Sequence, residues 1–90
     1  MGMAALKVRI MPEDVDTDMN FIESKLPGIV EKFQAKIHSS VIEEVAFGLK
    51  AIVLTLAWPE QNSQDDLEEQ LKTIEGVNSI EVLDFRRAIG

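Results

Sequence analysis

The chain has 90 residues, a formal net charge of −7 and no cysteine. This length fits one domain, residues 1–90, and the lack of cysteine excludes disulfide scaffolds, thiolate nucleophiles and cysteine-based zinc or iron–sulfur sites. The negative charge opposes non-specific binding to nucleic acid or anionic lipid, because both attract cationic surfaces. The first residues also lack a signal-peptide pattern. We therefore expect a cytoplasmic protein without direct contacts to nucleic acid or membrane.

The first predicted strand covers residues 6–11, where apolar and polar side chains alternate. An acidic loop follows, and Asp16, Thr17 or Asp18 can cap the helix after it. Pro27-Gly28 conflicts with this helix, since an interior proline costs about 3 kcal/mol. We predict one helix kinked at this pair, with two short helices as the alternative. The helix is indicated by an apolar stripe at steps of three and four residues: Ile22, Leu26, Ile29, Val30 and Phe33.

The most apolar stretch, residues 50–58, ends at Pro59. It is too short for a membrane span of about 20 residues, and its β-branched content predicts a central strand. Before it, residues 37–44 are polar enough for an edge strand, and residues 45–49 form a turn. One face of the central strand carries Ile52, Leu54, Leu56 and Trp58, and the other carries Ala51, Val53, Thr55 and Ala57.

A second helix is predicted to begin after Ser63, with Asp66 in the third position of a capping box. Gly76 is a candidate C-cap for this helix. Its buried stripe consists of Leu67, Leu71 and Ile74. The last strand is predicted over residues 77–85, with Ile80 and Val82 facing inward and Glu81, Leu83 and Phe85 facing outward.

The order strand, helix, strand, strand, helix, strand predicts an α+β fold. Two right-handed crossovers within one sheet give a ferredoxin-like two-layer βαββαβ sandwich, with an antiparallel four-stranded sheet and two helices on one face. The central strand is apolar on both faces. The sheet face without helices is therefore either a docking surface or an ordinary half-exposed surface.

Enzymatic chemistry has little support in the residues. His38 is the only histidine and nothing marks it as a base, and no glycine-rich phosphate loop is present. The acidic clusters at residues 13–18 and 65–69 lack the ligand spacing of a calcium loop, and acids at helix starts explain them better. Lys7 and Arg9 lack the aromatic partners that an RNA-binding sheet would supply. We expect no catalytic residue, metal site or cofactor.

Two short features indicate a partner-binding surface. Phe47-Gly48 places an aromatic side chain in a turn, and Arg86-Arg87 concentrates positive charge near the end of an acidic chain. Aromatic residues and arginines are favoured anchors of protein interfaces.

Around these residues the chain resembles the archaeal elongation factor 1-beta family, which exchanges nucleotide on elongation factor 1-alpha. The resemblance rests on four stretches: Val8 to Pro12, Ala46 to Ala51, Ile74 to Val77, and Val82 to Ile89. It covers essentially the whole chain. It implies a ferredoxin-like exchange domain that binds the GTPase and disturbs its magnesium and phosphate site, and that is not an enzyme.

The resemblance also implies which residues meet the GTPase. Phe47 matches the aromatic residue of the family's phenylalanine-glycine turn, and Arg87 matches a basic residue that is lysine in eukaryotes and approaches the magnesium and phosphate region. Because arginine is a planar fork rather than a point charge, its contact can differ in detail. The expected partner-binding residues are Phe47, Gly48, Lys50, Phe85, Arg86 and Arg87.

Two other functions fit the residues. One is a small ferredoxin-like regulatory module that binds a metabolite and dimerises through its open sheet face. The other is a binder of single-stranded RNA, whose affinity would fall steeply with salt.

Overall fold

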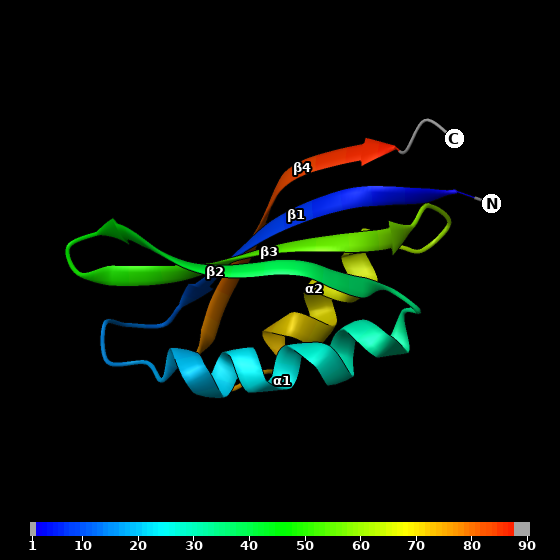
Figure 1. The fold of residues 1–90 in the computed structure, drawn as a ribbon. Helices are drawn as coiled ribbons and strands as arrows, with labels where there is room; N and C mark the ends of the chain where they lie inside the picture. Colours follow the sequence, from blue (N-terminus) through cyan, green and yellow to red (C-terminus); the bar gives the residue numbers. More distant parts are fainter. Residues whose placement is uncertain (1, 88–90) are drawn as a thin grey trace.

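The computed structural model describes residues 2–87 and contains one four-stranded sheet and two helices. The sheet has the order β2-β3-β1-β4 with antiparallel neighbours, and both helices cover the same face (Figure 1). The predicted ferredoxin-like βαββαβ fold is confirmed. The elements are β1 (Met3–Pro12), α1 (Met19–Lys32), β2 (Lys36–Ala46), β3 (Leu49–Pro59), α2 (Gln64–Lys72) and β4 (Val77–Arg87).

The core lies between the sheet and the helices. Trp58 is fully buried there, and its ring centroid lies 5.3 Å from that of Phe33. The indole Nε1–H donates to the carbonyl oxygen of Asn62 over 3.3 Å, so the one polar atom of this large side chain is paired. The residues of β1 and β3 that line the core are Leu6, Val8, Ile10, Ile52, Leu54, Leu56 and Trp58.

Helix α1 runs without a break through Pro27, so the alternative of two short helices is wrong. Asp18 caps its start by accepting the N–H of Phe21 over 3.1 Å. Pro27 and Gly28 both lie on the exposed side of the helix. The opposite side is held against the sheet by buried apolar residues, and this burial outweighs the local cost of the proline. Whether the helix bends at this pair stays a prediction.

Helix α2 begins as predicted, because Ser63 Oγ accepts the N–H of Asp66 over 3.4 Å. Its end differs from the prediction, since the C-cap is Thr73 rather than Gly76. Gly76 adopts a φ of +97° in the turn that leads into β4. A Cβ there would lie 2.8 Å from Thr17 Cγ2, so this turn needs glycine for both conformation and space.

Strand β4 corrects the predicted facing of one residue. Val82 pairs with Val8 and Asp84 pairs with Lys7, so Leu83 is left over as an irregularity in the ladder. The extra residue shifts the alternation that follows it. Phe85 consequently pairs with Leu6 and packs against the core, and the prediction that it faces outward is wrong.

The two residues of β4 that were predicted to face inward are not equally buried. Ile80 packs against the core as expected, whereas Val82 exposes 38% of its surface. Val82 lies opposite a core residue, but β4 is an edge strand and so its side chains are covered less completely.

Candidate partner-binding site

Phe47 and Gly48 form the tip of the hairpin between β2 and β3. Ala46 pairs with Leu49 across this tip, and the two residues between them have φ values of +53° and +78°. Positive φ at both positions is the signature of a type I′ turn, which normally carries asparagine or aspartate followed by glycine. A phenylalanine in the left-handed region costs about 1–2 kcal/mol. The turn therefore holds Phe47 in a backbone conformation that phenylalanine does not favour.

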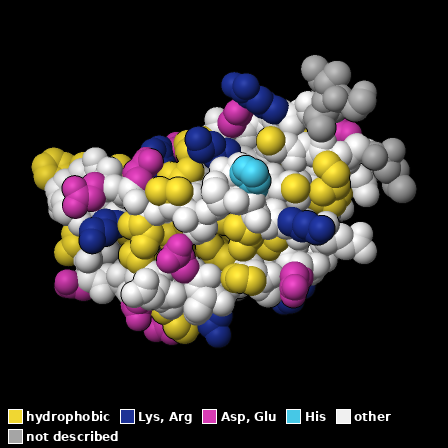
Figure 2. Space-filling model, in the orientation of Figure 1, with side chains coloured by type: hydrophobic (Ala, Val, Ile, Leu, Met, Phe, Trp, Pro, Cys, Tyr) yellow, Lys and Arg dark blue, Asp and Glu magenta, His cyan; other side chains and the backbone are white. Residues whose placement is uncertain are grey.

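The side chain of Phe47 is fully exposed, at 101% of its reference area. The hairpin that carries it extends beyond the helix layer (Figure 1), and hydrophobic side chains gather at this end of the molecule (Figure 2). Three further large apolar side chains of β2, namely Val41, Ile42 and Val45, are also exposed. Lys50 follows the turn, lies opposite Glu44 in the ladder and is exposed. The hairpin thus presents an apolar tip with charged residues beside it.

Arg86 and Arg87 lie at the other end of the sheet. Arg87 pairs with Ala4, which in turn pairs with Trp58 near the end of β3. From Leu49 to Trp58 the chain advances by roughly 3.3 Å per residue, which separates the two ends by about 30 Å. The molecule is 41 Å long and 22 Å wide. The residues expected to bind a partner therefore form two clusters at opposite ends of the long axis.

Each of the two arginines has a carboxylate partner within the protein. Arg86 Nε lies 2.9 Å from Asp84 Oδ2, and Arg87 Nε lies 3.3 Å from Glu60 Oε1. Both arginine side chains remain largely exposed, at 79% and 78%. Phe85, the residue before them, is half-buried and packs against the core, which attaches this end of β4 to the rest of the protein.

The sheet face without helices is covered at its centre by its own charged side chains. Arg9 forms ion pairs with Glu81 and with Glu43, the latter at 3.8 Å. Beneath them Ala51 is fully buried and Val53 is 7% exposed, although both belong to the open side of β3. The apolar residues on the open side of β3 are thus largely shielded from solvent at the centre of the sheet.

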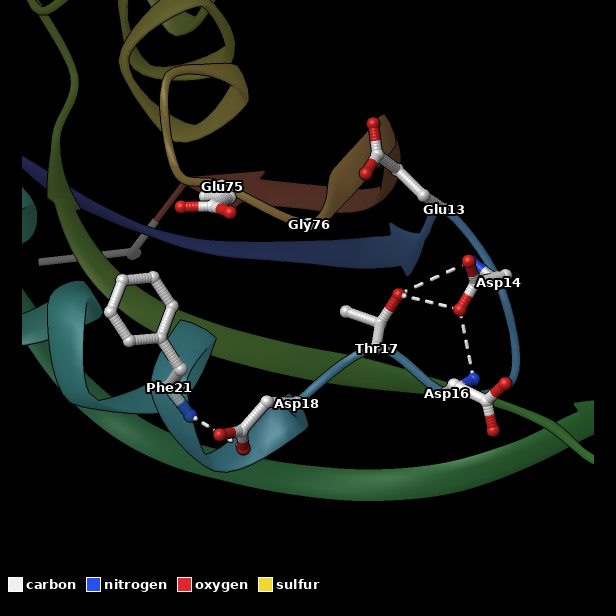
Figure 3. A pocket seen from close by; sticks show the side chains of 8 residues that line it. All are labelled: Glu13, Asp14, Asp16, Thr17, Asp18, Phe21, Glu75 and Gly76. Carbon is white, nitrogen blue, oxygen red and sulfur yellow. Dashed lines mark hydrogen bonds between the residues drawn. The ribbon is translucent and has the colours of Figure 1, made fainter.

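The acidic loop before α1 lines a hollow of about 420 Å³ (Figure 3). Two of its carboxylates are engaged in local structure: Asp14 Oδ1 accepts the N–H of Asp16 over 2.9 Å, and Asp18 caps α1. Across residues 2–87, no group of three His, Asp or Glu side chains is placed to hold a metal ion. His38, the only histidine of the chain, is exposed.

Comparison with known proteins decides the family. Residues 5–88 match the family model described as the EF-1 guanine nucleotide exchange domain. The chain belongs to this family. This membership assigns the chain an exchange role in translation elongation, rather than that of a metabolite-binding regulatory module.

Relatives from archaea match over nearly their full length. Elongation factor 1-beta of Methanosarcina barkeri is 38% identical over 97% of this chain and 99% of its own. The protein of the same name from Archaeoglobus fulgidus is 41% identical over 94% of this chain and 97% of its own. The exchange domain is similar to both.

One solved structure shares the fold. The ACT domain of a GTP pyrophosphokinase from Chlorobium tepidum superposes with a TM-score of 0.64, covering 90% of this chain and 99% of its own. The two sequences are only 21% identical, so this likeness concerns the fold alone.

No helix within residues 2–87 is long and apolar enough to cross a membrane.

Proposed function

We propose that this exchange domain acts on elongation factor 1-alpha and contacts the GTPase with both ends of its long axis. The observation that carries the proposal is the pairing of a strained, fully exposed Phe47 at one end with two exposed arginines at the other. Exposed aromatics and arginines are typical anchors of interfaces. Family membership supplies the kind of partner.

The exchange follows from thermodynamic linkage. A protein that binds the nucleotide-free GTPase more tightly than the GDP-bound form must weaken GDP binding by the same factor. The domain needs no covalent step for this, and we assign it no catalytic residue and no cofactor. GTP then displaces the domain when it refills the vacant site.

Arg87 is the residue that we place at the magnesium and phosphate region of the GTPase. Its guanidinium is always charged and carries several donors in one plane, which suits phosphate oxygens. A cation entering the magnesium site competes with the ion that holds the β-phosphate, so the ion is lost and GDP is held less tightly. Its exposure of 78% at the end of β4 leaves it able to reach a partner.

Phe47 has a different role in this proposal. It anchors the domain on a second part of the GTPase, with Gly48 supplying the turn and Lys50 lying beside it. Arg86 adds positive charge next to Arg87, and Phe85 fixes this end of β4 on the core. The two contacts act together because one rigid sheet joins them.

The remaining proposals concern the setting of the protein. We place it in the cytoplasm, where elongation occurs, as a single exchange domain over residues 1–90 without direct contacts to nucleic acid or membrane. The net charge of −7 supports the last point, since it repels other polyanions.

The experiment that tests Arg87 measures GDP release from elongation factor 1-alpha with the variant Arg87→Ala. We expect a loss of exchange rate of about tenfold or more, as for removal of a charge-stabilising group from a functional site. Lys32→Ala is the matched control, because it removes an exposed cation from the helix layer. An unchanged rate in Arg87→Ala, with binding intact, would show that Arg87 does not have this role.

A further inference from the structure

Glu60 gives Arg87 a partner that comes from another part of the fold. Asp84, the partner of Arg86, lies on the same strand, whereas Glu60 belongs to the loop that joins β3 to α2. The carboxylate Oε1 lies 3.3 Å from Arg87 Nε. The side chain of Glu60 is only 28% exposed, against 78% for Arg87. The carboxylate is thus the more buried member of the pair and the guanidinium the more exposed one.

Glu60 lies against Gly2 with both its backbone and its side chain. The backbone N–H of Glu60 donates to the carbonyl oxygen of Gly2 over 3.1 Å. A Cβ at Gly2 would lie 1.9 Å from Glu60 Oε2, so the carboxylate occupies the space that a larger residue would fill. Gly2, Glu60, Gln61 and Arg87 line a shallow hollow of about 430 Å³ at this end of the sheet.

We propose that Glu60 is a positioning residue that holds Arg87 against the β3–α2 loop in the free protein. Engagement of the GTPase then exchanges the carboxylate of Glu60 for an anionic group of the partner. This inference rests on the proposed function of Arg87, and it adds the group that restrains Arg87 before binding.

The pair is suited to such an exchange because it is weak and reversible. Exposed ion pairs contribute little in water, whereas a guanidinium pairs more strongly with the anionic oxygen ligands that magnesium leaves vacant on the GTPase. While Glu60 holds Arg87, only a fraction of the protein has its guanidinium free. The apparent affinity for the GTPase is reduced by that fraction.

The test is the variant Glu60→Gln, which removes the charge and keeps the shape. We expect the concentration of exchange factor that gives half-maximal GDP release to fall about two- to fivefold at low ionic strength, the range of an exposed ion pair. The maximal rate should not change, because Arg87 makes the same contact once it is bound. At about 1 M salt the difference should vanish, since charges there are screened within about 3 Å.

Two comparisons separate this effect from a general change of charge. Glu31→Gln removes an equal charge from the exposed side of α1 and should leave the half-maximal concentration unchanged. Glu60→Gln should also have no effect in the background of Arg87→Ala, because the restrained group is then absent. An effect that persists there, or a half-maximal concentration that rises in Glu60→Gln, would overturn the proposal.

A second readout needs no GTPase. The Nε–Hε signal of Arg87 in the NMR spectrum of the isolated protein should shift in Glu60→Gln and stay in place in Glu31→Gln. An unshifted signal would show that the pair does not restrain Arg87 in solution. If the wild-type protein failed to release GDP while this signal shifted, the proposed exchange role would be wrong and the ion pair with Glu60 would still be real.

Discussion

Phe47 combines two properties that stability alone does not explain. It is fully exposed, so it contributes nothing to the core, and it occupies a left-handed conformation that costs free energy. Strained residues of this kind concentrate at functional sites, where the surrounding structure holds them in place. The same turn would be easier to form with asparagine. The presence of an aromatic residue there is best explained by binding.

The variant Phe47→Asn separates stability from function. Asparagine tolerates a positive φ, and we expect the free energy of unfolding to rise by about 0.5–1 kcal/mol. Exchange on the GTPase should nevertheless weaken, because the apolar anchor is lost. Urea unfolding and GDP release measure the two effects on one protein. A variant that is both less stable and fully active would contradict this account of Phe47.

At the scale of the elements, helix α1 shows how burial overrides local propensity. An interior proline disfavours a helix by about 3 kcal/mol, yet α1 continues through Pro27. Pro27 is exposed, and the buried residues before and after it hold both halves of the helix on the same sheet. The proline is tolerated rather than required.

Pro27→Ala should therefore stabilise the protein. The gain from restoring a good helix former is partly offset, because proline also restricts the unfolded chain. We expect the free energy of unfolding to rise by about 1–2 kcal/mol, seen as a higher urea midpoint with an unchanged slope. Pro12→Ala, at the buried end of β1, is the control that should bring no such gain. A lower midpoint for Pro27→Ala would show that the proline has a structural role in α1.

The elements that the sequence predicted are those whose burial leaves a simple pattern. The helical stripe of α1 and the alternation in β1 each reflect a single buried face, and the continuous apolar run of β3 reflects burial on both faces. Phe85 was assigned to the wrong side because the irregularity at Leu83 depends on pairing with β1, and nothing within residues 77–85 marks it. A local pattern cannot reveal a shift that the neighbouring strand imposes.

The candidate site was predicted in part, and for a similar reason. The sequence indicated Phe47 and the two arginines as interface residues, because aromatic residues and arginines are favoured interface anchors. It gave no sign of the partner that Arg87 has in Glu60. These residues meet only because β1 pairs with β4 and because the β3–α2 loop bonds to Gly2.

In the proposed function, the whole molecule is a spacer between two contacts. The hairpin tip and the arginines are separated by most of the 41 Å length, and strands β3, β1 and β4 connect them by antiparallel pairing that is interrupted at Leu83. A partner that engages both ends must present two sites at this separation. The central ion pairs of Arg9 with Glu43 and Glu81 leave the open sheet face poorly suited to replace either contact.

Two separated contacts predict different kinetic effects for their variants. Phe47→Ala should raise the concentration needed for half-maximal exchange by about tenfold, since an interface anchor typically contributes more than 1 kcal/mol. Arg87→Ala should mainly lower the maximal rate. The free-energy effects of the two changes should add in the double variant, because the residues are far apart. Strong non-additivity would contradict a rigid two-ended engagement.

The most direct test of the whole account is release of a fluorescent GDP analogue from archaeal elongation factor 1-alpha. The exchange domain is added in amounts well below those of the GTPase, with excess unlabelled nucleotide present. We expect a large acceleration in which each molecule of the domain turns over many molecules of GTPase. No acceleration with a GTPase shown to bind and hydrolyse GTP would contradict the central claim that this chain is its exchange factor.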